Sequence, residues 1–297
     1  MDKEKTAIMR LQEAAQMSLA LYGLPLVITT SGGKDSSVCL ELAKRAGIQF
    51  EVMHNHTTAD APETVYFVRD DLKRTEEQGI KCTLNYPIYK GKRTSMWDLI
   101  PQKSIPPTRV VRYCCDILKE RGGNSRFIVT GVRWAESEKR ANNRGVLEIT
   151  HRDKEKRIIL NNDNDESRRL FEACTLKGKR VCNPIIDWSD ADVWDYIQSE
   201  HIVVNPLYQE GFNRVGCVGC PMAGTKGRQF EFARYPKFRE MYIRAFEKMM
   251  DERIRRNRIQ GTWRIGTTGR DIYHWWMEDG VLPGQLAFED FNENLEV

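Results

Sequence analysis

A glycine-rich segment, Ser31-Gly32-Gly33-Lys34-Asp35-Ser36, lies between an apolar run at 24–28 and a helix-like run at 38–46. A strand that passes through adjacent glycines into a helix lets backbone amides approach an anion closely, and Lys34 adds a full positive charge. The Walker A spacing, with four residues between its first glycine and its Gly-Lys pair, is absent. A tight capped turn is the purely structural alternative. We expect a phosphate site in an α/β fold.

Apolar runs alternate with helix-like segments along the first half of the chain. This alternation predicts right-handed crossovers and an α/β fold with a doubly wound, mostly parallel sheet. Ligands of such sheets lie beyond the carboxyl ends of the strands. The polar, highly charged residues 136–180 predict an exposed or mobile excursion over that site. The expected helices are 6–22 and 62–79, and the further expected strands are 49–55, 82–88 and 126–131.

Length and composition narrow the class of protein. At 297 residues, we expect a nucleotide-binding α/β domain with a four-cysteine site over 1–225 and a small helical, Arg- and Trp-rich C-terminal appendage over 226–297. A net charge of +4 permits a polyanionic partner without requiring one. No apolar run reaches the 18 residues that a membrane span needs, and no signal-peptide core follows Met1. We expect a cytoplasmic protein with no membrane partner.

Three later segments narrow the prediction to one family. The blocks Gly131–Arg140, Asn183–Ile197 and Asn205–Pro221 resemble, in order, conserved blocks of the phosphoadenosine phosphosulfate (PAPS) reductase family. Together with Ser31–Ser36, which resembles the PP-loop of the adenine nucleotide alpha hydrolases, the resemblance covers about residues 24–225. In that superfamily, also called N-type ATP pyrophosphatases, the loop wraps the phosphates of ATP or the sulfate end of a sulfonucleotide.

The resemblance implies roles for individual residues. Lys34, Asp35, Arg133 and Arg140 are the expected catalytic residues. The three cations would stabilise charge on the transferred group, and Asp35 would orient the loop or help to hold Mg²⁺. The expected nucleotide-binding residues are Ser31, Gly32, Gly33, Lys34, Asp35, Ser36, Gly131 and Arg133.

The chain departs from the family pattern at two places. Residues 55–58, Asn-His-Thr-Thr, stand where the family has Asp-Thr-Gly. His56 within this segment and His54 just before it allow either a structural or a catalytic role. The Glu-Cys-Gly-Leu-His ending of the sulfonucleotide reductases, whose cysteine attacks sulfur, is replaced by a different ending at 288–297. This replacement disfavours a reductase.

Two cysteine pairs suggest a metal centre. Cys114-Cys115 precedes a helix-like segment, and Cys217 and Cys220 form a Cys-x-x-Cys turn. Four thiolates can hold zinc or a [4Fe-4S] cluster, or can remain unliganded redox thiols, and spacing alone leaves these open. Adjacent cysteines suit the separate corners of a cluster. The arrangement resembles adenylylsulfate (APS) reductases and the DndC-type proteins of DNA phosphorothioation, which implies the cluster.

The remaining cysteines have no such partner in the sequence. We expect Cys39 and Cys82 in the core, and Cys174 or Cys182 as a candidate mobile redox thiol.

The leading hypothesis is an ATP pyrophosphatase that adenylates an acceptor for sulfur transfer and uses an iron-sulfur cluster. A nucleic acid, DNA or RNA, is a candidate acceptor, and a cysteine desulfurase or another protein is a candidate sulfur donor. One alternative is an APS or PAPS sulfonucleotide reductase. A second is a non-catalytic, cluster-bearing subunit that binds nucleic acid.

A basic C-terminal stretch motivates the nucleic-acid alternative. Arginines and tryptophans together can follow a phosphate backbone and stack on bases. Interleaved acidic residues support a solvated helix face instead. The residues concerned are Arg244, Lys248, Arg253, Arg255, Arg256, Arg258, Arg264, Arg270, Trp263, Trp275 and Trp276.

Overall fold

The computed structural model describes residues 2–150, 157–161, 179–258, 263 and 265–278. They form two compact units, each built from several stretches of the chain. The first unit comprises 1–56, 62–85 and 120–216, and the second comprises 57–61, 86–119 and 217–297. The predicted boundary between 225 and 226 stays a prediction.

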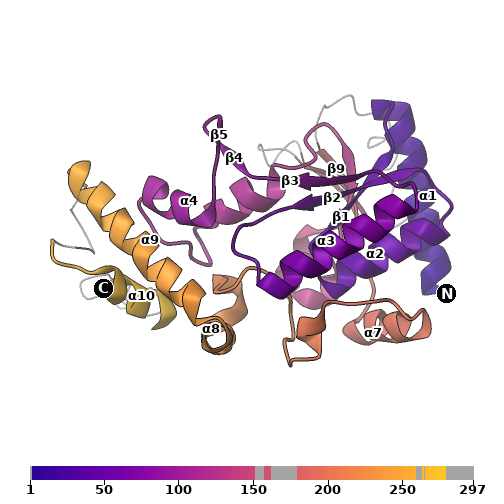
Figure 1. Cartoon of the computed structure of the whole chain (residues 1–297). Helices are drawn as coiled ribbons and strands as arrows, with labels where there is room; N and C mark the ends of the chain where they lie inside the picture. The colour runs from indigo at the N-terminus through magenta and orange to yellow at the C-terminus, as the bar shows by residue number, and fades with distance from the viewer. Residues whose placement is uncertain (1, 151–156, 162–178, 259–262, 264, 279–297) are drawn as a thin grey trace, which may run out of the picture. The chain divides into compact units, whose positions relative to one another are not determined.

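The first unit is built on a seven-stranded sheet in the order β3-β2-β1-β6-β9-β7-β8. Figure 1 labels β3, β2, β1 and β9 of this sheet. From β1 the sheet grows in one direction through β2 and β3, and in the other through β6 and β9, all parallel. This reversal of strand order beside β1 is the expected doubly wound arrangement. The strands are β1 (Leu26–Thr30), β2 (Phe50–Asn55), β3 (Cys82–Asn85), β6 (Phe127–Val129), β7 (Leu147–Thr150), β8 (Ile158–Leu160) and β9 (Lys179–Cys182).

Part of residues 136–180 belongs to the sheet and does not form the predicted excursion. β7 pairs antiparallel with both β8 and β9, and β9 lies beside β6 within the sheet. Leu147, Ile149 and Val181 are buried there, and these short apolar stretches are masked in the sequence by the charged residues between them. The prediction was therefore wrong for β7, β8 and the start of β9, whereas residues 136–139 and 141–143 are exposed as expected.

Helices lie along the sheet of the first unit (Figure 1). Their apolar side chains and those of the strands form one buried cluster. α1 and α2 contribute Leu11 and Leu42 to the same cluster as Ile28 of β1 and Phe127 of β6. Val27 belongs to a second, smaller cluster, because neighbouring residues of a strand point to opposite faces. The helices are α1 (Lys3–Tyr22), α2 (Lys34–Arg45), α3 (Pro62–Glu77), α5 (Glu138–Asn143) and α7 (Asp190–Ser199).

The second unit is mainly helical, and helices fall within the predicted C-terminal region. α9 contacts α4, α8 and α10, and aromatic rings join them: Trp97 of α4 and Trp276 of α10 both pack against Tyr242 of α9. A two-stranded antiparallel hairpin precedes α4. The strands and longer helices of the second unit are β4 (Ile88–Tyr89), β5 (Lys92–Arg93), α4 (Met96–Lys103), α8 (Gly224–Arg234), α9 (Pro236–Arg255) and α10 (Gly269–Glu278).

No helix in the described ranges combines the length and the hydropathy that crossing a bilayer requires.

Candidate nucleotide site and four-cysteine site

The loop between β1 and α2 has the geometry expected of an anion-binding turn. Ser36 Oγ donates to the carbonyl of Gly33 at 2.8 Å and accepts from the amide of Ser31 at 3.2 Å. Gly32 has φ +76°, and a Cβ there would lie 2.8 Å from Val68 Cγ2, so conformation and space both favour glycine. α2 begins directly at Lys34, so its first amides lie at the end of β1.

Two buried cations meet beside this loop. Lys34 is 7% exposed and Arg133, which follows β6, is 3% exposed. The Oδ1 atom of Asp190, at the start of α7, lies 2.8 Å from Lys34 Nζ and 3.0 Å from Arg133 Nη2. Arg133 Nε lies 2.7 Å from Asp35 Oδ1. The structure therefore gathers three predicted site residues, and adds a carboxylate that holds both cations.

Aromatic residues pack around Lys34. Its backbone amide donates to Tyr208 Oη at 3.0 Å, and its Nζ lies 5.9 Å from the ring centroid of Trp194. Burial raises the pKa of Tyr208 to about 12, so its hydroxyl stays protonated and neutral. A hydrogen bond from Lys34 holds the pKa of Asp190 below its ordinary value, so this carboxylate is charged at neutral pH.

Gly131 lies where the loop that carries Arg133 packs against the loop that carries Lys34. A Cβ at this position would lie 2.8 Å from the backbone carbonyl carbon of Asp35, closer than real Cβ contacts allow. The predicted role of Gly131 at the site thus has a steric basis, because the end of β6 touches the start of α2.

Arg140 is placed differently from the other predicted cations. It pairs with Glu136 within the same segment, and the Oε1 atom of Glu136 also accepts from the backbone amide of Arg133 at 3.0 Å. Its observed partner is therefore a neighbouring carboxylate, and a direct catalytic role for Arg140 stays a prediction.

Sequence reasoning did not single out Asp190, Tyr208 or Trp194 as site residues. Asp190 lies in the first turn of a helix capped by Ser189, where an acidic residue is already explained by the helix dipole. The available signal was the position of this capped helix inside a family block.

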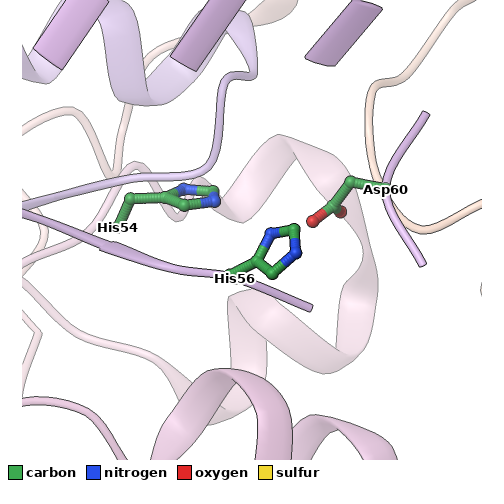
Figure 2. Close-up of side chains that lie close together, drawn as sticks. All are labelled: His54, His56 and Asp60. Carbon is green, nitrogen blue, oxygen red and sulfur yellow. The ribbon is translucent and has the colours of Figure 1, made fainter. Parts of the chain in front are cut away.

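His54 and His56 lie at the carboxyl end of β2, where Figure 2 shows their rings. The Nδ1 atom of His54 lies 2.9 Å from the carbonyl oxygen of Thr30, and the two histidine ring centroids are 6.5 Å apart. His54 is buried, and its contact joins β2 to the end of β1. This geometry supports a structural role for His54. Asp60, also labelled in Figure 2, belongs to the second unit.

The second unit contains both cysteine pairs. Cys115 begins a short π-helix, Cys115–Glu120, and its Sγ accepts from Arg112 Nη2 at 3.2 Å. A hydrogen bond from the Cys114 thiol, with the one from Arg112, lowers the pKa of Cys115 to about 6. That hydrogen bond and burial raise the pKa of Cys114, and the charges of Cys115, Cys217 and Cys220 add to the shift. The four thiols thus lie within electrostatic reach of one another.

The Cys-x-x-Cys turn is held rigidly. The amide of Cys220 donates to the carbonyl of Cys217 at 3.2 Å, and the amide of Gly219 donates to buried Glu231 at 2.6 Å. Gly219 has φ +73°, and a Cβ there would lie 2.4 Å from Phe232 Cζ, so only glycine fits. Burial raises the pKa of Cys217 to about 11, although the positive charge of Lys119 opposes the shift.

The spacing of the four sulfurs bears on which group they could hold. A single tetrahedral zinc needs thiolates about 3.8 Å apart, given Zn–S bonds of about 2.3 Å. Within the part of the chain that the structure describes, no three cysteine sulfurs lie within 4.8 Å of one another. A cluster accepts one sulfur on each of several separated irons.

The other described cysteines belong to the first unit. Cys39 and Cys182 are buried, and Cys82 is half-buried. Cys182 is a fully buried residue of β9, so the alternative prediction that it is a mobile thiol was wrong. Cys174 lies outside the described residues.

The chain was compared with known proteins. The family profile described as "Phosphoadenosine phosphosulfate reductase domain" matches residues 25–223. An uncharacterized protein of Methanocaldococcus jannaschii is 29% identical over 228 residues, which cover 74% of this chain and 46% of that protein. Sulfate adenylyltransferase subunit 2 of Shewanella frigidimarina is 28% identical over 194 residues, which cover 64% of this chain and 61% of that protein.

Among solved structures, the U34-tRNA thiolase NcsA of Methanococcus maripaludis with its [4Fe-4S] cluster matches with a TM-score of 0.42 and 13% identity, covering 85% of this chain and 81% of that chain. The chain thus spans about half the length of the first curated relatives that it matches.

Proposed function

Because the chain belongs to the phosphoadenosine phosphosulfate reductase domain family, we propose that it binds ATP and transfers the adenylyl group to an acceptor for sulfur transfer. The observation that carries this proposal is the pair of buried cations, Lys34 and Arg133, held by one carboxylate of Asp190. Their position beside β1 is where open α/β sheets bind ligands. Similarity to a sulfate adenylyltransferase subunit supports adenylyl transfer.

The proposed reaction is a displacement at the α-phosphorus of ATP. An acceptor oxygen attacks this phosphorus, the bond to the bridging oxygen breaks, and pyrophosphate leaves with that electron pair. Lys34 and Arg133 would neutralise the charge on the phosphates, and the first amides of α2 would donate to them. Mg²⁺ would arrive with ATP, and Asp35 remains the expected residue to orient the loop or contact that ion.

We further propose that Cys114, Cys115, Cys217 and Cys220 hold a [4Fe-4S] cluster. The donor set fits this group, because the four thiols lie in one unit within electrostatic reach of one another, and adjacent cysteines suit separate corners of a cluster. When bound, the cluster would supply a place where sulfur is held or relayed. Arg112 donates to the Cys115 sulfur and stabilises its thiolate, while Glu231 fixes the turn between Cys217 and Cys220.

A product assay tests the adenylation proposal. The purified chain is incubated with Mg²⁺ and ATP, APS or PAPS, with and without RNA or DNA acceptors and a persulfide-carrying cysteine desulfurase. With ATP, the expected products are pyrophosphate together with AMP or an adenylated acceptor. Lys34→Ala should abolish it, whereas Lys44→Ala, in the last turn of the same helix, should retain it.

Other products would redirect the assignment. Sulfite released from APS or PAPS with a thiol reductant would replace the proposal with a sulfonucleotide reductase. Binding of ATP without turnover across all acceptors would replace it with a non-catalytic subunit.

A separate experiment tests the cluster. Anaerobic purification should yield a brown protein with about four irons and four sulfides per chain and a broad visible absorption band. Cys217→Ser should lose the colour, and Cys82→Ser, a half-buried cysteine on β3, should keep it. Zinc in stoichiometric amount, with colourless wild-type protein, would overturn the cluster assignment.

A further inference from the structure

The stretch 86–113 of the second unit has a strong excess of positive charge. It carries six basic residues and one acidic residue, Asp98. The carboxylate of Asp98 has a partner close in sequence, because it accepts a hydrogen bond from the Ser95 hydroxyl at 2.5 Å at the start of α4. The basic residues are Lys90, Lys92, Arg93, Lys103, Arg109 and Arg112, of which all but the half-buried Lys103 are exposed.

Cations lie close to aromatic rings on the hairpin and at the end of α4. The guanidinium carbon of Arg93 lies 3.7 Å from the ring centroid of Tyr86. Lys103 Nζ lies 4.6 Å from the centroid of Tyr89 and 5.9 Å from that of Tyr113. These contacts bring β4, β5, the end of α4 and the segment before Cys114 onto one surface. We define the hairpin surface as a set of seven residues on and beside the hairpin: Tyr86, Ile88, Tyr89, Lys90, Lys92, Arg93 and Lys103.

The hairpin surface is open to solvent. Tyr86 is 40% exposed and Ile88 is 59% exposed, and nearby Val110 is 90% exposed. Planar and apolar side chains among unneutralised cations are the combination that single-stranded nucleic acids require, since phosphates meet the charges and bases stack on the rings.

The C-terminal stretch that the sequence favoured for this role is less suitable. Trp263 and Trp276 are only 5% and 3% exposed, so they belong to the core and are not available to stack on bases. Arg255 and Arg256 both pair with Glu252, which neutralises part of the charge on α9. The structure thus favours the hairpin surface over α9 as a nucleic-acid site.

We propose that the hairpin surface binds single-stranded nucleic acid. Lys90, Lys92 and Arg93 contact its phosphates, and Tyr86 supports its bases. Arg112, in the same basic stretch, donates to Cys115, so the stretch continues to the four-cysteine site within one unit. The inference rests on the proposed function only in making the bound strand the acceptor, because binding itself is measured without ATP.

Fluorescence anisotropy with a labelled single strand of about 20 nucleotides tests the proposal. RNA and DNA versions, a duplex of the same sequence and vesicles of anionic phospholipid form the comparison arms. The triple variant Lys90→Ala/Lys92→Ala/Arg93→Ala should bind at least about tenfold more weakly and lower the salt slope by about two. The matched control Arg244→Ala/Lys248→Ala/Arg255→Ala removes the same charge from exposed positions of α9 and should change binding less than about twofold.

A second variant separates stacking from charge. Tyr86→Leu keeps an apolar side chain and all cations, so it should weaken binding and leave the salt slope unchanged.

Three results would overturn the proposal: equal loss in the two triple variants, no binding to any single strand, or preference for vesicles over every nucleic acid. Thermal melting of each variant confirms that it folds. Because these experiments omit ATP, their failure leaves the adenylation proposal standing, and failure of the product assay leaves nucleic-acid binding standing.

Discussion

The two cationic regions of this protein differ in how their charge is kept. In the first unit, Lys34 and Arg133 are buried and held by Asp35 and Asp190 at 2.7–3.0 Å. In the second, Lys90, Lys92 and Arg93 are exposed, in a stretch with a single acidic residue. Buried, paired cations have fixed positions and suit one anion of defined shape. Exposed cations suit a long, variable polyanion.

The largest expected effect comes from removing Arg133. Arg133→Ala leaves Asp35 without its nearest cation, so the free energy of unfolding should fall by about 3 kcal/mol and ATP affinity by more than about a hundredfold. Urea unfolding and calorimetric titration with ATP measure these. Arg140→Ala is the comparison variant, expected to change ATP affinity less than about threefold because Arg140 pairs with Glu136. A similar loss in both variants would restore Arg140 to the site and remove the contrast between them.

Salt should separate the two regions. Raising monovalent salt from about 50 to 200 mM should weaken binding of the single strand about twentyfold, if three phosphates are neutralised. ATP binding to the buried pair should weaken by about threefold or less, because buried charges are screened less than exposed ones. Parallel titrations with the labelled strand and with ATP give both slopes. Equal slopes would mean that burial does not distinguish the two sites.

Asp190 provides a smaller test, in the opposite direction. Its carboxylate contacts both cations and competes with phosphate for them, so Asp190→Asn should bind pyrophosphate about tenfold more tightly. Asp195→Asn, an exposed position on the same helix, is the control and should leave the Kd unchanged. Weaker binding in Asp190→Asn would show that Asp190 assists the ligand and does not compete with it.

The smallest expected effect is on the pH dependence of pyrophosphate binding. The pKa of Asp190 is lowered, so its carboxylate is charged above its ordinary pKa and loses charge only as the pH falls through the lowered value. The ratio of wild-type to Asp190→Asn affinity for pyrophosphate should therefore stay constant between about pH 7 and 9. Titrations at several pH values measure it. A ratio that drifts in this range would mean that another titrating group controls the contact.

Much of the fold was predictable from local sequence patterns. The strand, glycine turn and helix around Ser31–Ser36, the parallel strands beside it and the Ser189 cap were all predictable, because each is encoded by neighbouring residues. The strands β7, β8 and β9 were missed because each is only three or four residues long and lies in a charged stretch.

The candidate site was predictable only in part, because its contacts are distant in sequence. Lys34 and Arg133 follow strand ends and could be named from the motifs, but Asp190 meets them across 156 and 57 positions. The hairpin surface was overlooked because its basic residues are fewer than those of α9. Only the structure shows that Trp263 and Trp276 are buried and that Tyr86 is exposed.

The contact between Gly131 and the carbonyl of Asp35 sets a mechanical limit on the nucleotide site. Backbone conformation does not demand glycine at 131; the missing side-chain volume does. Alanine at this position would push the two loops apart and move Arg133, two residues later, away from Lys34, although no charged group would be removed. The distance between Lys34 and Arg133 therefore depends on the absence of a side chain at position 131. A redesign of the site for a longer or shorter anion would have to begin with this residue.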